Sequence, residues 1–364
     1  MTSNRIRSFC TSFALAFMLV LPVFLTPLPH AFAQDTTKTD LPMISEKDWL
    51  AYSEKFLTKD GRILDDANGN ISHSEGQGYG LLLALMAGRP ADFELIWSFT
   101  RTEMLIRNDG LSAWKWDPAS RPHITDTNNA SDGDILIAYA LALAAQKWNN
   151  ADYRKTAITI AASLLKKQIT TQHDEVILLP AIRGFSAKDR DDGPVINLSY
   201  WVFEAFPVLN ELAPSPSWDA LAKSGLQLLQ QSRFGTHQLP SDWISLKNKP
   251  QPATGFEPEF SYNNLRIVLY LARAGLGKQD ITQQLAKAMT GQDRAVNLMN
   301  IKTDKPVASL SEAGYRIIPQ LAACIGNGTK LSDDVTRFEP SQYYPSTLHL
   351  LALSYTARNH PECL

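Results

Sequence analysis

The sequence predicts an all-α protein whose helices stack in pairs. Three observations carry this prediction: hydrophobic stretches with helical period recur nearly end to end, strand-like runs are few and short, and strands do not alternate with helices as a parallel sheet requires. Of the 364 residues, 44% are hydrophobic and 20% are charged, as in ordinary globular proteins. No linker rich in Pro, Gly or Ser follows residue 43, so we expect a single domain.

The chain begins with an expected secretory signal peptide over residues 1–33. Arg5 and Arg7 precede the apolar stretch Phe13–Leu25, and the small-residue pattern Ala31–Ala33 favours cleavage after Ala33. Neither this stretch nor any later one reaches the roughly 20 apolar residues of a membrane span. We therefore expect a secreted or periplasmic protein with no span after cleavage, whose domain covers residues 34–364 and starts with a polar lead-in to residue 42.

The rest of the chain contains stretches that follow the helical period, joined by short loops. Helices are expected near Glu46–Leu57, Glu75–Gly88, Ala91–Leu105, Asp132–Trp148, Ala151–Gln168, Ser199–Leu212, Trp218–Ser232, Tyr262–Ala274, Ile281–Met289, Ser309–Ala323 and Pro345–Tyr355. The clearest strand-like run is Val176–Ala181.

Charge and motif content exclude several functions. The formal net charge is −2, and it becomes −4 once Arg5 and Arg7 leave with the signal, which gives no electrostatic case for nucleic acid. The seven histidines form neither an HExxH motif nor a close ligand pair, and the phosphate-loop and GxSxG motifs are missing. We therefore expect no metal and no cofactor.

Two cysteines remain after the signal, Cys324 and Cys363. Export permits a disulfide between them, which would tie down the C-terminus. The alternative is that Cys324 is an ordinary buried thiol of its helix.

The start of the second expected helix holds a carboxylate among glycines. In the stretch "SHSEGQGYG", Gly76, Gly78 and Gly80 surround Glu75, although each costs a helix about 1 kcal/mol relative to Ala. The helix dipole alone would favour Glu75 there, but it does not explain three glycines. We interpret the glycines as clearance for a flat polymer that meets Glu75.

Other joints between helices are also rich in polar and aromatic residues. In "NNASDGD", Asp132 and Asp134 exceed what a helix cap needs, so one of them is expected to face a cleft. Aromatic rings at such joints stack on sugar rings, whose hydroxyls need amide and charged partners, although each ring could equally belong to the core. The substrate-binding candidates are Trp114, Trp116, Asn129, Tyr200, Trp201, Tyr262, Arg266, Tyr343 and Tyr344.

These motifs resemble those of glycoside hydrolase family 8. The resemblance runs through "SEGQGYG" (74–80), "NNASDGD" (128–134), "NLSYW" (197–201), "LPSDW" (239–243), "FSYNNLR" (260–266) and "QYYPSTLHLL" (342–351), and thus covers nearly the whole mature chain. The similarity is greatest to the exported endoglucanases that accompany bacterial cellulose synthesis. It implies an (α/α)6 barrel with an open cleft and inverting hydrolysis of β-1,4-glucan.

The resemblance also implies roles for individual residues. Glu75 matches the general acid, and Asp132 matches the acidic residue that contacts the sugar at the cleavage point. One position departs from the pattern, because Asn263 stands where the usual general base is an Asp, and an amide cannot take up a proton as a carboxylate does. The base candidates are then Asp132, Glu257 and Glu259, with Asp242 a weaker one.

The function predicted from the sequence is an endo-β-1,4-glucanase (a cellulase) that trims or edits cellulose chains, with the cellulose-synthesis machinery as a further partner. One alternative is a glucan-binding protein of the same fold that has lost catalysis. The other is a hydrolase of chitosan, xylan or mixed-linkage glucan.

Overall fold

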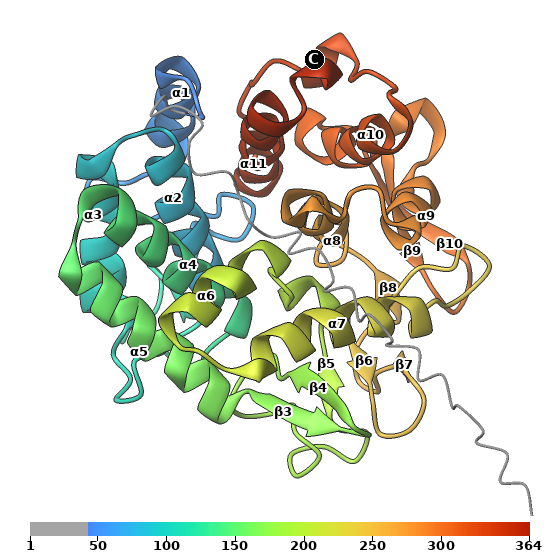
Figure 1. The fold of residues 1–364 in the computed structure, drawn as a ribbon, viewed down its shortest axis with the longest axis horizontal. Coiled ribbons are helices and arrows are strands. Elements are labelled where there is room, and N and C mark those ends of the chain that lie inside the picture. The colour runs from blue at the N-terminus through green and yellow to red at the C-terminus, as the bar shows by residue number, and fades with distance from the viewer. Residues whose placement is uncertain (1–42) are drawn as a thin grey trace, which may run out of the picture. The chain divides into compact units, whose positions relative to one another are not determined.

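The computed structural model describes residues 43–364, which form a ring of paired helices (Figure 1). The expected all-α class is confirmed, because only short strands accompany the helices. The ring closes where α1 (Glu46–Phe56) meets α11 (Tyr343–Asn359), with 2.8 Å between Tyr52 Oη and Thr347 Oγ1. The predicted signal peptide and lead-in lie outside the described residues. Within residues 43–364, no helix combines the length and apolarity needed to cross a bilayer.

The remaining helices follow the expected stretches. They are α2 (Ser74–Met86), α3 (Pro90–Phe99), α4 (Ser131–Trp148), α5 (Ala151–Lys167), α6 (Phe206–Leu212), α7 (Pro216–Gln231), α8 (Arg266–Leu271), α9 (Asp280–Met289) and α10 (Ala313–Asn327). π-Helical turns extend α3 over Thr100–Met104 and α8 over Ala272–Leu276.

The strands form small antiparallel sheets between the helices. They are β1 (Ser72–His73), β2 (Lys115–Trp116), β3 (Ile169–Gln172), β4 (Glu175–Leu178), β5 (Val195–Ile196), β6 (Ile244–Ser245), β7 (Gln251–Pro252), β8 (Glu259–Phe260), β9 (Val296–Asn300) and β10 (Lys305–Leu310). The pairings are β1–β2, β3–β4, β5–β6–β7 and β8–β9–β10. The strand expected at Val176–Ala181 is therefore real but shorter, and it pairs as a hairpin.

The helices are of two kinds. Some have buried side chains on all faces, and others have buried side chains on one face only. In α2 every residue except Glu75 is buried, and all six residues of α8 are buried. By contrast, α1 buries only Trp49, Tyr52 and Phe56, which lie on one face. The first kind forms the inner wall of the ring, and its N-terminal ends supply the polar residues discussed below.

Helices α2 and α4 cross too closely for side chains between them. A Cβ on Gly78 would lie 2.6 Å from the Cβ of Leu136, and a Cβ on Gly133 would lie 2.1 Å from Ser74 Oγ. A Cβ on Gly80 would lie 2.5 Å from a side-chain carbon of Ile63. Our interpretation of the glycines around Glu75 is therefore wrong for Gly78 and Gly80, which leave room for the protein's own packing and not for a polymer. A Cβ on Gly76 would instead lie 3.1 Å from Tyr343 Oη.

Three expected helices begin later than predicted. Residues 198–205 form two short 3-10 turns, so that α6 begins only at Phe206. Helix α8 begins at Arg266 rather than Tyr262, because the preceding residues turn around Asp242, which accepts a hydrogen bond from the Ser261 N–H at 2.9 Å. Residues 305–310 pair with β9, so α10 begins at Ala313.

Of the two alternatives for the cysteines, the structure has the disulfide. Cys324 of α10 and Cys363 at the C-terminus are bonded across 39 residues of sequence, and both are buried. The bond fixes the last turn of the chain against α10, where the Leu331 N–H also donates to the Cys363 carbonyl at 2.9 Å.

We predict that Cys363→Ser lowers the free energy of unfolding by about 2–4 kcal/mol, because a disulfide limits the unfolded chain. Urea denaturation under non-reducing conditions measures the change. The double variant Cys324→Ser with Cys363→Ser serves as the control and should be equally destabilised. Equal stability of the wild type with and without reductant would contradict the prediction.

Candidate active site

A cavity of about 690 Å³ opens at the N-terminal ends of the inner helices. Carboxylates, an arginine, amides and several aromatic rings line it, and they come from segments throughout the sequence. Its lining residues are Asp65, Ala67, Asn68, Ile71, His73, Ser74, Glu75, Trp114, Lys115, Ala130, Asp132, Tyr200, Tyr262, Asn263, Arg266, Tyr315, Gln342, Tyr343, Tyr344 and Pro345.

The guanidinium of Arg266 joins the two main carboxylates. It donates through Nη1 to Glu75 Oε1 and through Nη2 to Asp132 Oδ2, the latter at 2.7 Å. It also donates to Ser199 Oγ at 3.1 Å and to the Ser199 carbonyl at 3.3 Å. Arg266 is only 1% exposed, so these bonds replace its lost hydration and fix the three segments on one cation.

Glu75 and Asp132 differ in exposure. The side chain of Glu75 is 19% exposed, whereas that of Asp132 is 3% exposed. Burial raises the pKa of Asp132 to about 6, since the charge of Arg266, which opposes the shift, is offset in part by nearby Glu75. Both carboxyl groups line the cavity, and Glu75 is the more open of the two to a ligand.

His73 is a site residue that the sequence reasoning missed. Its Nδ1 accepts from the Gly76 N–H at 2.9 Å and so caps α2, while Nε2 lies 3.4 Å from Asp65 Oδ2 and Nδ1 lies 4.0 Å from Glu75 Oε2. Burial alone would lower the pKa of His73, but the hydrogen bond to Asp65 and the charge of Glu75 outweigh it and raise that pKa. Its place two residues before Glu75 was the only available signal.

Several predicted aromatic residues do face the cavity. Trp114, Tyr200, Tyr262 and Tyr344 line it, and the residue Tyr262 is 47% exposed. The hydroxyl of Tyr344 donates to the Tyr262 carbonyl at 3.0 Å, and the Trp114 indole N–H donates to Asp126 Oδ2 at 2.9 Å, so both rings are held in place.

Tyr343 also lines the cavity but offers a different group. Its ring is only 1% exposed, and its hydroxyl is buried with no hydrogen-bond partner among residues 43–364. Tyr315, which the sequence reasoning also missed, lies beside Tyr262 and Tyr344 in the same wall.

Three other predicted binding residues belong to the interior of the protein: Trp201, Trp116 and Asn129. Trp201 is fully buried against Gly225 and donates its indole N–H to the Leu221 carbonyl at 3.0 Å. Trp116 is 7% exposed and stacks on His123 with 3.9 Å between ring centroids.

The amide of Asn129 is used up inside the protein. Its Nδ2 donates to Asp134 at 2.8 Å and to Gln168 at 2.9 Å, and its Oδ1 accepts from the Ile182 N–H at 3.0 Å. Because Asn129, Trp116 and Trp201 are absent from the cavity lining, we correct their assignment from substrate binding to packing and internal hydrogen bonding.

Some of the candidates for the general base lie outside the cavity. Glu257 is exposed, Glu259 is half-buried in β8, and neither lines the cavity. Asn263 does line it, and its Nδ2 donates to Asp242 Oδ2 at 3.0 Å. Burial raises the pKa of Asp242 to about 6, although hydrogen bonds from Ser261 and Asn263 oppose the shift.

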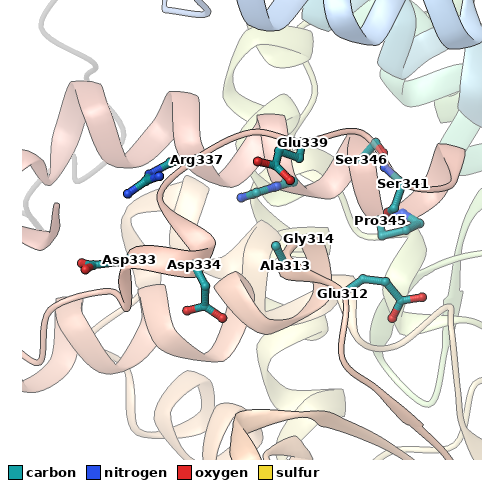
Figure 2. A pocket seen from close by; sticks show the side chains of 11 residues that line it. Glu312, Ala313, Gly314, Asp333, Asp334, Arg337, Glu339, Ser341, Pro345 and Ser346 are labelled. Carbon is teal, nitrogen blue, oxygen red and sulfur yellow. Dashed lines mark hydrogen bonds between the residues drawn. The ribbon is translucent and has the colours of Figure 1, made fainter.

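A second cavity of about 530 Å³ lies beside α10 and the start of α11, and it shares Pro345 with the first (Figure 2). It contains Glu312, Asp333, Asp334 and Glu339, but Glu312 and Asp333 lie at opposite ends of the view in Figure 2. Among residues 43–364 no three His, Cys, Asp or Glu side chains are grouped as a metal site would need. The cavity around Glu75 holds two carboxyl groups on one buried guanidinium, which makes it the better candidate for chemistry.

Comparison with known proteins gives a consistent result. The sequence model of the family described as Glycosyl hydrolases family 8 matches residues 28–358. The endoglucanase of Cellulomonas uda is 37% identical over 226 residues, which are 62% of this chain and 62% of that protein. The probable endoglucanase of Novacetimonas hansenii is 35% identical over 250 residues, 68% of each chain. The chain thus spans less than two thirds of the first of these relatives.

Solved structures agree with the sequence matches. Endoglucanase Cel10 of Klebsiella pneumoniae, a family 8 glycosyl hydrolase, superposes with a TM-score of 0.77 at 31% identity, over 86% of this chain and 99% of that one. The endo-β-1,4-glucanase CMCax of Acetobacter xylinum gives 0.75 at 30% identity, over 85% and 97%. These likenesses confirm the expected barrel of paired helices.

We predict that Arg266→Lys lowers kcat about 10²-fold. An ammonium cannot hold both carboxylates as a guanidinium does. The lost hydrogen bond to a charged group contributes about 1.5–3 kcal/mol, which corresponds to this fall in kcat. The matched control is Arg273→Lys. Arg273 is also buried and bridges a carboxylate, that of Glu204, but it lies outside the cavity lining. Both variants should be less stable in urea, and only Arg266→Lys should lose kcat per folded molecule. Equal kcat in the two variants would refute the role of Arg266.

Proposed function

Because this chain belongs to glycosyl hydrolase family 8, we propose that it is an endo-β-1,4-glucanase that cleaves β-1,4-glucan with inversion of configuration. The observation that carries the proposal is the position of Glu75, an accessible carboxyl group on the guanidinium that also holds buried Asp132. The aromatic rings of the same cavity suit the apolar faces of glucose units, and its carboxylates, amides and Lys115 suit their hydroxyls.

Glu75 acts as the general acid in this proposal. Arg266 holds Glu75 beside Asp132, and the charge of Glu75 contributes to the raised pKa of buried Asp132. Glu75 is the more exposed of the two groups, and we therefore assign it to the protonation of a glycosidic oxygen in the cavity. We assign Asp132, which lies on the same cation and also lines the cavity, to the contact with the sugar at the cleavage point.

Inversion also requires a water that attacks the anomeric carbon from the face opposite the leaving group. Glu75 and Asp132 are neighbours on one guanidinium, an arrangement that suits two groups on one side of the sugar better than an acid and a base flanking it. Asn263, which lines the cavity from the segment before α8, is the group we assign to the attacking water.

A glucan is favoured over a cationic polymer by the charges of the cavity. The carboxylates of Asp65, Glu75 and Asp132 are nearly balanced by Lys115 and Arg266. Chitosan would be expected to select a more acidic lining. Trimming of nascent cellulose, in contact with the synthesis machinery, remains the proposed physiological role.

Export is part of the proposal. The N-terminal pattern that ends at Ala33 supports a signal peptide, and the Cys324–Cys363 disulfide is compatible with an oxidising compartment outside the cytoplasm. A secreted or periplasmic glucanase accounts for both observations.

We predict that Glu75→Gln lowers release of reducing sugar from carboxymethylcellulose by roughly 10²–10⁴-fold, because the amide has no proton to give. Binding of cellohexaose, measured by calorimetry, should persist. The matched control combines Glu257→Gln with Glu259→Gln, which removes two carboxylates that do not line the cavity and should leave kcat within about twofold of wild type.

The wild type should release the α-anomer first, which proton NMR detects directly. Wild-type protein that binds cellohexaose but releases no sugar would instead establish the alternative, a glucan-binding protein without hydrolysis. Loss of activity in the Glu257 and Glu259 control would move the base to β8 and its neighbourhood.

A further inference from the structure

Asn263 and Asp242 form a pair at the edge of the cavity. Asn263 lines the cavity, whereas Asp242 lies behind it and is 6% exposed. The Asn263 Nδ2 donates to Asp242 Oδ2 at 3.0 Å, so the amide connects the cavity to a buried carboxylate.

The orientation of the Asn263 amide follows from this bond. An ionised carboxylate only accepts hydrogen bonds, so the NH2 group of Asn263 must face Asp242 and the Oδ1 must point elsewhere. The Oδ1 accepts no side-chain hydrogen bond within residues 43–364, and it is not among the buried unpaired atoms. It is therefore free to accept a hydrogen bond from a water in the cavity.

Asp242 is held rigidly behind this amide. Its Oδ1 accepts from the Ser261 N–H at 2.9 Å, and its own backbone N–H donates to the Glu259 carbonyl at 2.7 Å. Burial raises the pKa of Asp242 to about 6, which makes its carboxylate a stronger proton acceptor than an exposed aspartate at neutral pH.

The other carboxylates of the cavity have competing partners. Asp132 engages Arg266 with Oδ2 and the Gly133 N–H with Oδ1, at 2.8 Å for the latter. Asp65 accepts from Asn68 at 2.6 Å and lies against His73. The side-chain hydrogen bond of Asn263 goes to Asp242, and the family resemblance implies that the attacking water lies at position 263.

We propose that Asn263 relays the proton of the attacking water to Asp242, so that the pair replaces the single carboxylate expected at this position. This inference rests on the proposed function. In the step, the water oxygen bonds to the anomeric carbon as the bond to the glycosidic oxygen breaks, and Glu75 gives its proton to that oxygen. The water proton passes to Asn263 Oδ1 while an Nδ2 proton passes to Asp242 Oδ2.

The amide is left as its imidic acid tautomer, and no oxidant or further reactant is needed. After the sugar leaves, Asp242 returns its proton to Nδ2 and the Oδ1 proton passes to water. Glu75 regains a proton from solvent, which restores the starting state. Asp242 acts through Asn263 and is therefore a positioning and relay residue, while Asn263 touches the reacting water.

The test compares Asp242→Asn alone with Asp242→Asn combined with Asn263→Asp. The single variant keeps an oxygen to accept from Asn263 but cannot take a proton, so kcat on carboxymethylcellulose should fall at least 100-fold. In the double variant, a carboxylate at position 263 can accept the proton directly, supported by the amide at 242. Its kcat should recover to within about tenfold of wild type.

The dependence of kcat on pH gives a second readout, through its acid limb. Asp242 must be ionised to accept a proton, so wild-type kcat should fall as pH falls through about 6. In the double variant the limb should move toward about 4, the ordinary value for an exposed aspartate. A merely structural Asp242 would produce neither the rescue nor this shift.

Asp134→Asn is the matched control. Asp134 is buried and also accepts from one backbone N–H, that of Ser112, and one asparagine amide, that of Asn129, each at 2.8 Å. Since it lies outside the cavity lining, its substitution should reduce stability and leave kcat unchanged.

Three results would overturn the relay: more than a tenth of wild-type kcat in Asp242→Asn, no rescue in a folded double variant, or equal loss of kcat in the Asp134→Asn control. Near-ultraviolet circular dichroism and cellohexaose binding establish that each variant is folded. An inactive wild type would refute the proposed function itself. An inactive wild type with an active Asn263→Asp variant would show that the base was lost without replacement.

Discussion

The buried guanidinium of Arg266 is the interaction on which the site depends. It ties the start of α8 to Glu75 of α2, to Asp132 of α4 and to the turn at Ser199. A buried charge that loses its partner costs about 3–5 kcal/mol, so each of these segments is strongly constrained to its place. The faces of Tyr200 and Tyr270 flank the guanidinium at 5.6 and 5.9 Å, which excludes water from it.

The close crossing of α2 and α4 makes this arrangement possible. Gly133 brings the start of α4 against Ser74 at the start of α2, and Glu75 and Asp132 each occupy the second position of their helix. Helix N-termini carry a partial positive charge that favours anions. Two such ends and one guanidinium together offset part of the cost of holding two carboxyl groups away from water.

The sequence predicted the helical ring and the acidic positions better than it predicted packing. Helices buried all round, such as α2 and α4, have long apolar runs that begin just after a polar joint, so both were found nearly to the residue. The purpose of Gly78, the burial of Trp201 and the internal bonding of Asn129 depend on partners distant in the chain, and no local pattern reports them. The pairing of His73 with Asp65 was invisible for the same reason.

Asp134 and Asp242 have the same local hydrogen-bonding arrangement but different roles. Each accepts one backbone N–H and one asparagine amide, and burial raises the pKa to about 7 for Asp134 and about 6 for Asp242. A folded-state pKa above the ordinary value of 3.8 means that stability present below that value is lost as pH rises toward 6 or 7. At neutral pH Asp242 is therefore mostly ionised, whereas Asp134 is only partly ionised. At Asp134 the amide that accompanies the carboxylate is enclosed by protein, and the arrangement only fixes the start of α4. At Asp242 the corresponding amide, that of Asn263, lines the cavity. The carboxylate of Asp242, whose pKa is raised, can therefore accept a proton from a bound water through this amide.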